Sequence, residues 1–94
     1  MKKESPSTNQ PLYVISVAAR LTKTHPRTLR IYEEFGLLNP ARTQGNIRLY
    51  SPGDINLIRR IRYLTRVKNV NLAGVKIILE IEDKYGIVVI EKEF

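Results

Sequence analysis

The sequence contains no cysteine, only one histidine, and no long run of apolar residues. The lack of cysteine excludes disulfides, zinc sites with thiolate ligands and thiol-based redox sensing. A single histidine, His25, is too few for a histidine-rich metal site. The longest apolar runs, 12–15 and 87–90, have four residues each, far fewer than a membrane-spanning helix needs. The amino-terminal end also lacks an apolar run, so we expect no signal peptide and a cytoplasmic protein.

The sequence also lacks the residue groups that carry most enzyme chemistry. No pair of carboxylates lies near a candidate nucleophile, and no glycine-rich loop suited to phosphate binding is present. Glu33 and Glu34 lie beside basic residues, which makes them candidate salt-bridge partners rather than catalytic acids. We therefore expect no enzyme, no catalytic residue, no cofactor and no metal.

The length of 94 residues allows one small domain. A chain of this size buries a limited core and is marginally stable alone. A second subunit would add buried area, so we expect a homodimer.

Positive charge is concentrated in the middle of the chain. The net charge is +7, but residues 20–68 hold eleven basic side chains against three acidic ones. Residues 69–94 hold three lysines against five acids. A focused positive field is typical of proteins that bind polyanions, although a solvated basic surface gives the same composition.

Two short helices are predicted near the amino-terminal end. Residues 1–11 are polar and predict a disordered arm, followed by an extended segment over 12–15. Ser16 can cap a helix over 17–22, whose inward side chains would be Val17, Ala18 and Leu21. After a turn at 22–24, His25 and Pro26 have the types of a helix cap and first helical residue. The second helix is expected to end at Gly36, which completes a helix-turn-helix pattern.

The next segment changes to an extended pattern. Residues 37–50 read as strand, loop and strand, with a basic and polar tip at about 42–46. Gly45 is suited to the turn. A basic β-hairpin beside a helix-turn-helix is the wing of a winged DNA-binding domain.

Two longer helices and an apolar tail complete the chain. Ser51, Pro52 and Asp54 form a strong helix start, and apolar residues then recur at helical spacing: Ile55, Ile58, Ile61 and Leu64. Asn71 caps a further helix that ends near Gly86, with inward side chains at Leu72, Val75, Ile78 and Leu79. The tail 87–90 would pair at a dimer interface or fold back on its own subunit.

Ordered motifs over residues 12–82 resemble the MerR family of bacterial regulators. The shared residues are Thr28-Leu29-Arg30-Ile31-Tyr32-Glu33, Gly36-Leu37-Leu38, Pro40-Ala41-Arg42-Thr43, Gly45, Arg48-Leu49-Tyr50-Ser51 and Asp54. The resemblance implies a mainly α fold, a MerR-type winged helix-turn-helix over 12–86 with a β-hairpin wing and two further helices. It also implies a transcriptional regulator that binds an inverted repeat in double-stranded promoter DNA as a dimer.

A finer resemblance is to the heat-shock repressor (HspR) branch of this family. It rests on Tyr13-Val14-Ile15-Ser16-Val17-Ala18-Ala19, His25-Pro26 and Asn71-Leu72-Ala73-Gly74-Val75. The branch implies repression of chaperone operons in the nucleoid, with the DnaK chaperone as co-repressor.

The sequence departs from the family pattern at two places. Lys23 stands where the family often has glycine, so a left-handed backbone there would carry modest strain. Eight residues follow Gly86, too few for the family's long dimerisation helix, and we expect no effector domain. The mode of dimerisation is therefore open, with the tail 87–94 as a candidate dimer contact, and we expect no metal or drug sensing.

Donor side chains on the second helix and on the hairpin are the candidate DNA contacts. They are His25, Arg27, Thr28, Arg30, Tyr32, Arg42, Gln44, Asn46, Arg48 and Tyr50. The alternative to DNA contact for Tyr32 is a place in the core. The alternative for Tyr50 is packing against the third helix. Four more basic residues either contact phosphates that flank the binding site or belong to a solvated charged face: Arg59, Arg60, Arg62 and Lys68.

Two other functions remain compatible with the sequence. An architectural, excisionase-like DNA-binding protein would use a similar winged fold without a regulatory partner. An RNA-binding module would present aromatic side chains on a sheet, but the seven aromatic residues are spread along this chain.

Overall fold

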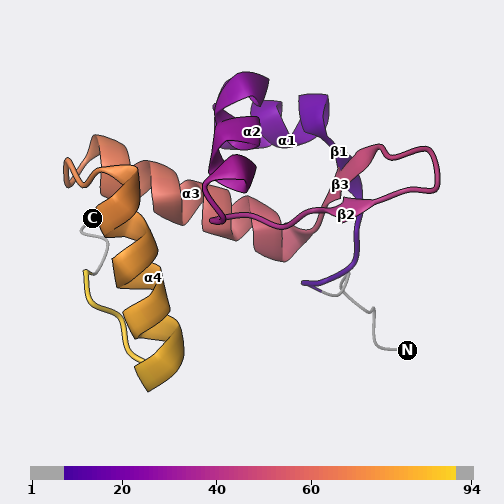
Figure 1. The fold of residues 1–94 in the computed structure, drawn as a ribbon. Coiled ribbons are helices and arrows are strands. Elements are labelled where there is room, and N and C mark those ends of the chain that lie inside the picture. The colour runs from indigo at the N-terminus through magenta and orange to yellow at the C-terminus, as the bar shows by residue number, and fades with distance from the viewer. Residues whose placement is uncertain (1–7, 91–94) are drawn as a thin grey trace, which may run out of the picture. The chain divides into compact units, whose positions relative to one another are not determined.

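A computed structural model describes residues 8–90 as two compact units that divide after Ile58. The element order is β1 (Tyr13–Val14), α1 (Ile15–Thr22), α2 (Pro26–Glu34), β2 (Ala41–Arg42), β3 (Arg48–Tyr50), α3 (Pro52–Arg66) and α4 (Leu72–Tyr85) (Figure 1). The mainly helical fold with a small sheet confirms the predicted class. No helix within the described residues has the length and apolarity needed to cross a membrane.

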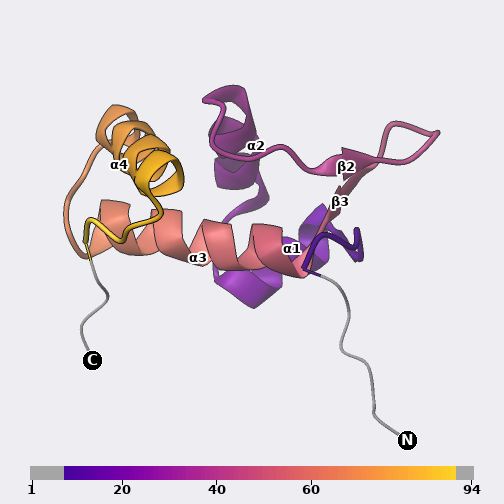
Figure 2. The same ribbon diagram turned by 90° about the horizontal axis from the view of Figure 1, so that it is seen from below.

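The first unit is built on a small antiparallel sheet with strand order β1-β3-β2. Tyr13 pairs with Tyr50 between β1 and β3, and Arg42 pairs with Arg48 between β2 and β3. The loop between β2 and β3 extends beyond the sheet as a hairpin (Figure 2). The predicted strand, loop and strand over 37–50 is therefore confirmed, with short strands.

Helix α1 differs from its prediction at its start and in its buried face. It begins at Ile15 with Val14 as the cap residue, so Ser16 lies inside the first turn and is not the cap. Its buried side chains are Ala18, Ala19 and Thr22. Val17 and Leu21 were expected to face inward but are 39% and 42% exposed. Small residues on the packed face allow α1 to lie close to α2, which it contacts.

Lys23 ends α1 in the left-handed conformation, with φ 52°. Its N–H donates to the carbonyl of Arg20 at 3.3 Å, and the Thr24 N–H donates to the carbonyl of Ala19 at 3.0 Å. The turn predicted at 22–24 is thus present, and Lys23 carries the backbone strain expected where glycine is common.

The segment before β1 is held against the start of α3. The Gly53 N–H donates to the carbonyl of Thr8 at 2.8 Å, and the Leu12 N–H donates to the carbonyl of Tyr50 at 3.1 Å. A Cβ at Gly53 would lie 2.8 Å from the Thr8 oxygen, so this approach requires glycine. The disordered arm 1–11 stays a prediction: Thr8 is bound to Gly53 within the described part, and residues 1–7 lie outside it.

The core of the first unit comes from both helices, the sheet and the start of α3. Its buried side chains are Ala18, Leu29, Tyr32, Leu37, Leu38, Tyr50, Ile55 and Ile58. Ser51 and Asp54 begin α3 as predicted, because Asp54 N–H donates to Ser51 Oγ and Ser51 N–H donates to Asp54 Oδ2, both at 3.0 Å. This reciprocal cap fixes the direction in which β3 leads into α3.

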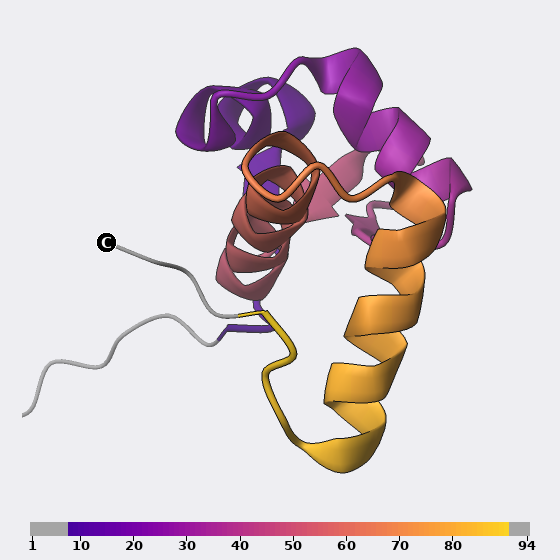
Figure 3. The same cartoon turned by 90° about the vertical axis from the view of Figure 1, so that its left-hand side faces the viewer.

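The second unit contains the end of α3, the loop 67–71 and α4 (Figure 3). Ile61, Leu64 and Val75 are buried in it. Leu72, Ile78 and Leu79 were expected to face inward and are half-buried. Asn71 caps α4 as predicted, since its Oδ1 accepts from the Gly74 N–H at 2.8 Å, and Gly86 ends it with φ 63°.

The tail after α4 turns back toward its own helix. The Ile87 N–H donates to the carbonyl of Glu82 at 3.2 Å, and the Val89 N–H donates to Glu82 Oε2 at 2.8 Å. The side chains of Ile87, Val88 and Val89 are 44–59% exposed. Folding back on the same subunit was one of the two alternatives for residues 87–90. Dimer contact stays a prediction, and residues 91–94 lie outside the described part.

Candidate nucleic-acid interface

Helix α2 begins with a side-chain cap, as the sequence predicted. The Nδ1 atom of His25 accepts a hydrogen bond from the Arg27 N–H at 3.0 Å, and Pro26 occupies the first helical position. Because Nδ1 is the acceptor, the ring proton of neutral His25 resides on Nε2. The exposed ring therefore presents an N–H donor at the amino-terminal end of α2.

One side of α2 is packed and the other carries exposed arginines. Leu29 and Tyr32 are buried, whereas Arg27 and Arg30 are exposed. Residues three apart on a helix are neighbours on its surface, so the two guanidinium groups share one face. Thr28 lies half-buried in the first turn. This arrangement, a buried apolar face and an exposed cationic face, is what groove recognition requires.

The tip of the hairpin is polar and exposed. Thr43 closes it, because its carbonyl accepts from the Asn46 N–H at 2.9 Å and its Oγ1 accepts from the Ile47 N–H at 3.1 Å. Gln44 and Asn46 are exposed, and Asn46 adopts the left-handed conformation with φ 63°. Gly45 lies in the turn but without a positive φ, so Asn46 makes the tight reversal instead.

Glu33 connects α2 to both strands of the hairpin. Its Oε2 accepts from an Nη of Arg42 at 2.7 Å, and its Oε1 accepts from Nε of Arg48 at 2.6 Å. Glu33 lies three residues after Arg30, so Glu33 and Arg30 are neighbours on the surface of α2. Through Glu33, the hairpin cations Arg42 and Arg48 are thus bound to α2.

The ionisation of Glu33 reflects this contact. Burial acts to raise the pKa of Glu33, but hydrogen bonds and charge from Arg48 and Arg42 outweigh it, so the pKa is lowered. The same hydrogen bond raises the pKa of Arg48. The carboxylate therefore stays ionised at neutral pH, and Arg42 and Arg48 are partly committed to it.

Two tyrosines predicted to contact DNA are buried instead. Tyr50 is fully buried, and its hydroxyl has no hydrogen-bond partner among residues 8–90. Burial raises the pKa of Tyr50. Contact between Tyr50 and DNA is wrong for this conformation, because the ring fills the core behind the hairpin. Tyr32 is 5% exposed, which favours the alternative of a core aromatic residue.

The basic residues beyond the first unit have separate surroundings. Arg60 donates to Glu82 Oε2 at 2.6 Å, so its charge is neutralised inside the second unit. Arg59 is exposed, whereas Arg62 and Lys68 are half-buried. Of these four, Arg59 keeps the exposure that a phosphate contact would need.

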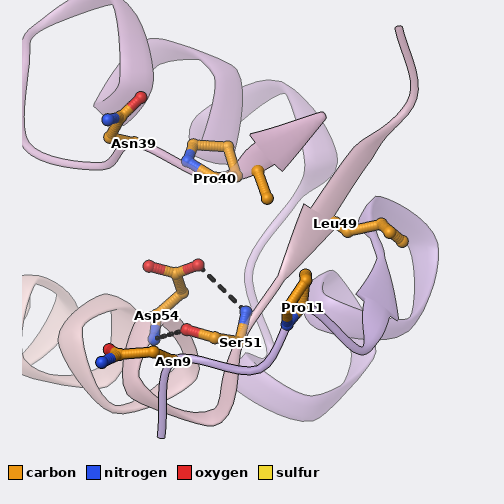
Figure 4. A pocket seen from close by; sticks show the side chains of 8 residues that line it. Asn9, Pro11, Asn39, Pro40, Leu49, Ser51 and Asp54 are labelled. Atoms are coloured by element: carbon orange, nitrogen blue, oxygen red, sulfur yellow. Dashed lines mark hydrogen bonds between the residues drawn. The ribbon is translucent and has the colours of Figure 1, made fainter. Parts of the chain in front are cut away.

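A shallow pocket of about 250 Å³ lies near the start of α3 (Figure 4). Asn39 and Pro40 line one side, while Ser51 and Asp54 face them across it. The Asp54 carboxylate is already used by the helix cap. The described residues contain no group of three or more metal-ligating side chains.

Comparison with known proteins decides the family. Residues 13–81 match the family described as MerR HTH family regulatory protein. The chain belongs to the MerR family. Residues Thr28, Leu29 and Arg30 lie on α2, and Gly45 lies in the turn of the hairpin.

Two curated relatives carry names that describe them as a heat shock protein and as an HTH-type transcriptional regulator. The heat shock protein HspR of Streptomyces coelicolor is 50% identical over 74 residues, which cover 79% of this chain and 49% of that protein. The regulator GlnR of Bacillus anthracis is 39% identical over 69 residues, 73% of this chain and 53% of that protein. The chain thus spans about half the length of these curated relatives.

A solved structure of a MerR-family regulator is also similar. The transcription regulator PbrR691 from Ralstonia metallidurans CH34, solved in complex with lead(II), superposes with a TM-score of 0.71 at 30% identity. The match covers 81% of this chain and 59% of that one.

Sequence reasoning identified Glu33 as a salt-bridge partner but missed its role between the hairpin arginines. The signal was present in the spacing of Arg42 and Arg48. These residues flank a five-residue loop and therefore pair across the hairpin, where two like charges require a counter-ion.

Proposed function

We propose that this protein is a sequence-specific DNA-binding regulator that represses heat-shock and chaperone genes. The observation that carries the proposal is that the hairpin is tied to α2, where Glu33 binds both Arg42 and Arg48 and the exposed Arg27 and Arg30 lie on the same helix. Similarity to HspR supports the choice of target genes.

In the proposed complex, α2 enters the major groove with its amino-terminal end foremost. Arg27 and Arg30 then reach base edges or phosphates, with His25 and Thr28 beside them. Gln44 and Asn46 at the hairpin tip lie toward the flanking minor groove, together with the guanidinium edges of Arg42 and Arg48 that Glu33 leaves exposed. Phosphate contacts fix the register and base contacts select the sequence.

A homodimer on an inverted repeat is part of the proposal. Two recognition helices would occupy successive major grooves about 34 Å apart, and the two-fold symmetry of the protein would match that of the operator. A dimer bound to the promoter would then block transcription. The protein would reside on the nucleoid in the cytoplasm.

The resemblance to heat-shock repressors supports a DnaK chaperone as co-repressor. A pull-down from cell extract, combined with operator binding measured with and without purified DnaK, tests this step. Co-purification and tighter operator binding are expected. Absence of both effects would remove DnaK from the proposal and leave the DNA-binding function standing.

The experiment that tests the function is footprinting on the chaperone promoters of the source organism at several salt concentrations. A defined footprint over an inverted repeat is expected, with affinity that falls steeply as salt rises, because bound phosphates release counter-ions. Duplex DNA should compete far better than RNA of the same sequence. Diffuse protection of any DNA would favour an architectural protein over a repressor.

A further inference from the structure

Arg42 and Arg48 are directly opposite each other in the hairpin. Directly opposed residues of an antiparallel pair project from the same side of the sheet, and like charges in that position destabilise the pairing. The hairpin therefore needs an anion between the two guanidinium groups. The strands supply none, because β2 and β3 contain no acidic residue.

Glu33 supplies that anion from a different element. Each oxygen of its carboxylate takes one arginine, with 2.7 Å to Arg42 and 2.6 Å to Arg48. Two hydrogen bonds to two strands fix both the height and the rotation of the hairpin relative to α2, which a single contact would leave free. The side chain of Glu33 is 23% exposed, so the contact is partly shielded from solvent.

We propose that Glu33 is a positioning residue that sets the wing relative to the recognition helix before DNA arrives. The proposal rests on the proposed DNA-binding function. By holding Arg42 and Arg48 in place, Glu33 lowers the conformational cost of ordering the wing against the duplex.

Removal of the Glu33 charge tests the proposal directly, because two physical effects change the DNA affinity in opposite directions. Glu33 puts a negative charge on the cationic surface, so simple electrostatics predicts that removing this charge tightens DNA binding. Loss of the bridge frees the wing and separates two arginines that then repel, which weakens DNA binding. The sign of the change in affinity therefore distinguishes positioning from bulk charge.

Helix α2 contains a matched control. Glu34 is the adjacent residue and is exposed; its side chain makes no hydrogen bond with residues 8–90 and acts on Arg48 through its charge alone. E34Q removes the same charge from the same helix and leaves both hydrogen bonds of the bridge in place. We expect E34Q to bind the promoter as tightly as the original protein or about twofold tighter, as for one screened surface charge.

The test compares E33Q, E33D and E34Q by fluorescence anisotropy on the footprinted promoter fragment. E33Q should bind about three- to tenfold more weakly, in line with the loss of a partly buried charged network. E33D keeps the charge but shortens the reach, so it should be weakened as well. Thermal unfolding of each variant checks that the core is intact.

A second readout needs no DNA. Heteronuclear NOE values of the backbone amides at 43–47 report fast motion of the wing, and they should fall in E33Q but not in E34Q. Tighter binding by E33Q, or wing amides as rigid as in the original protein, would overturn the proposal. If the proposed DNA-binding function is wrong, the unsubstituted protein will give no footprint. The NOE comparison between E33Q and E34Q would still test whether Glu33 holds the wing in place.

Discussion

The Nδ1 atom of His25 accepts a hydrogen bond from the backbone N–H of Arg27 at 3.0 Å, so one side chain both caps α2 and orients its own Nε2–H donor. The cap satisfies one of the free N–H groups at the start of the helix. The same contact leaves the Nε2–H exposed where α2 would meet a DNA phosphate. The capping role is visible in the structure, and the DNA contact is a prediction.

Two substitutions at this position separate the roles. H25A removes the cap and should lower the free energy of unfolding by about 1 kcal/mol. H25N keeps a good capping side chain and should retain most of the stability. Neither variant has a donor that reaches as far as Nε2–H, so both should bind the promoter more weakly; urea unfolding measures the stability and anisotropy measures the binding. Unchanged promoter binding by H25N would remove His25 from the interface.

Tyr50 offers a test of its corrected role. Its hydroxyl is buried without a partner among the described residues, which carries an uncompensated desolvation cost. Y50F should therefore leave the free energy of unfolding unchanged or raise it, and promoter affinity should not change. Y50A should lose about 3–5 kcal/mol, because the ring fills the core. Loss of affinity in Y50F at full stability would restore Tyr50 as a DNA contact.

The lowered pKa of Glu33 predicts a pH dependence of stability. A carboxylate whose folded pKa lies below its unfolded value stabilises the fold above the unfolded pKa, about 4.3 for glutamate. That stabilisation is lost as the pH falls through the lower, folded pKa. Urea unfolding of the original protein and E33Q at several pH values measures it. The difference between them should be constant near neutral pH and shrink below about pH 4; a difference that does not shrink would contradict the ion pairs.

Local signals in the sequence predicted the elements whose determinants are local. Pro26 and His25 fix the start of α2, and the Ser51 and Asp54 pair fixes the start of α3, because each cap acts within three residues. The apolar spacing from Ile55 to Leu64 predicted the buried stripe of α3 for the same reason. These features need no knowledge of the tertiary fold.

The prediction of buried side chains failed where packing between helices determines which face is buried. The buried face of α1 consists of Ala18, Ala19 and Thr22, whose small side chains give a weak hydrophobic signal over eight residues. The larger Val17 and Leu21 were predicted to be buried but are exposed. Spacing alone does not distinguish a close-packed small face from an exposed apolar one.

In the candidate site, too, features set by local sequence were predictable and features set by tertiary packing were not. The exposure of Arg27 and Arg30 follows from helical spacing and was predictable. The burial of Tyr50 depends on which face of β3 meets the core, and a shift of one residue would reverse it. The partners of Glu33 lie nine and fifteen residues away, so the pairing of Arg42 with Arg48 predicts a counter-ion but does not identify Glu33 as that counter-ion.

The central claim is that the exposed cations of α2 form the surface that binds DNA. R27A and R30A each remove one of these cations, and K76A removes the same charge from the exposed face of α4. The direct measurement is the affinity of these three variants for the footprinted promoter at several salt concentrations. We expect R27A and R30A to weaken binding by about tenfold or more, with a salt slope reduced by about 1 for each lost phosphate contact, and K76A to change it by less than about twofold. Equal losses in all three variants, or none in R27A and R30A, would contradict the account.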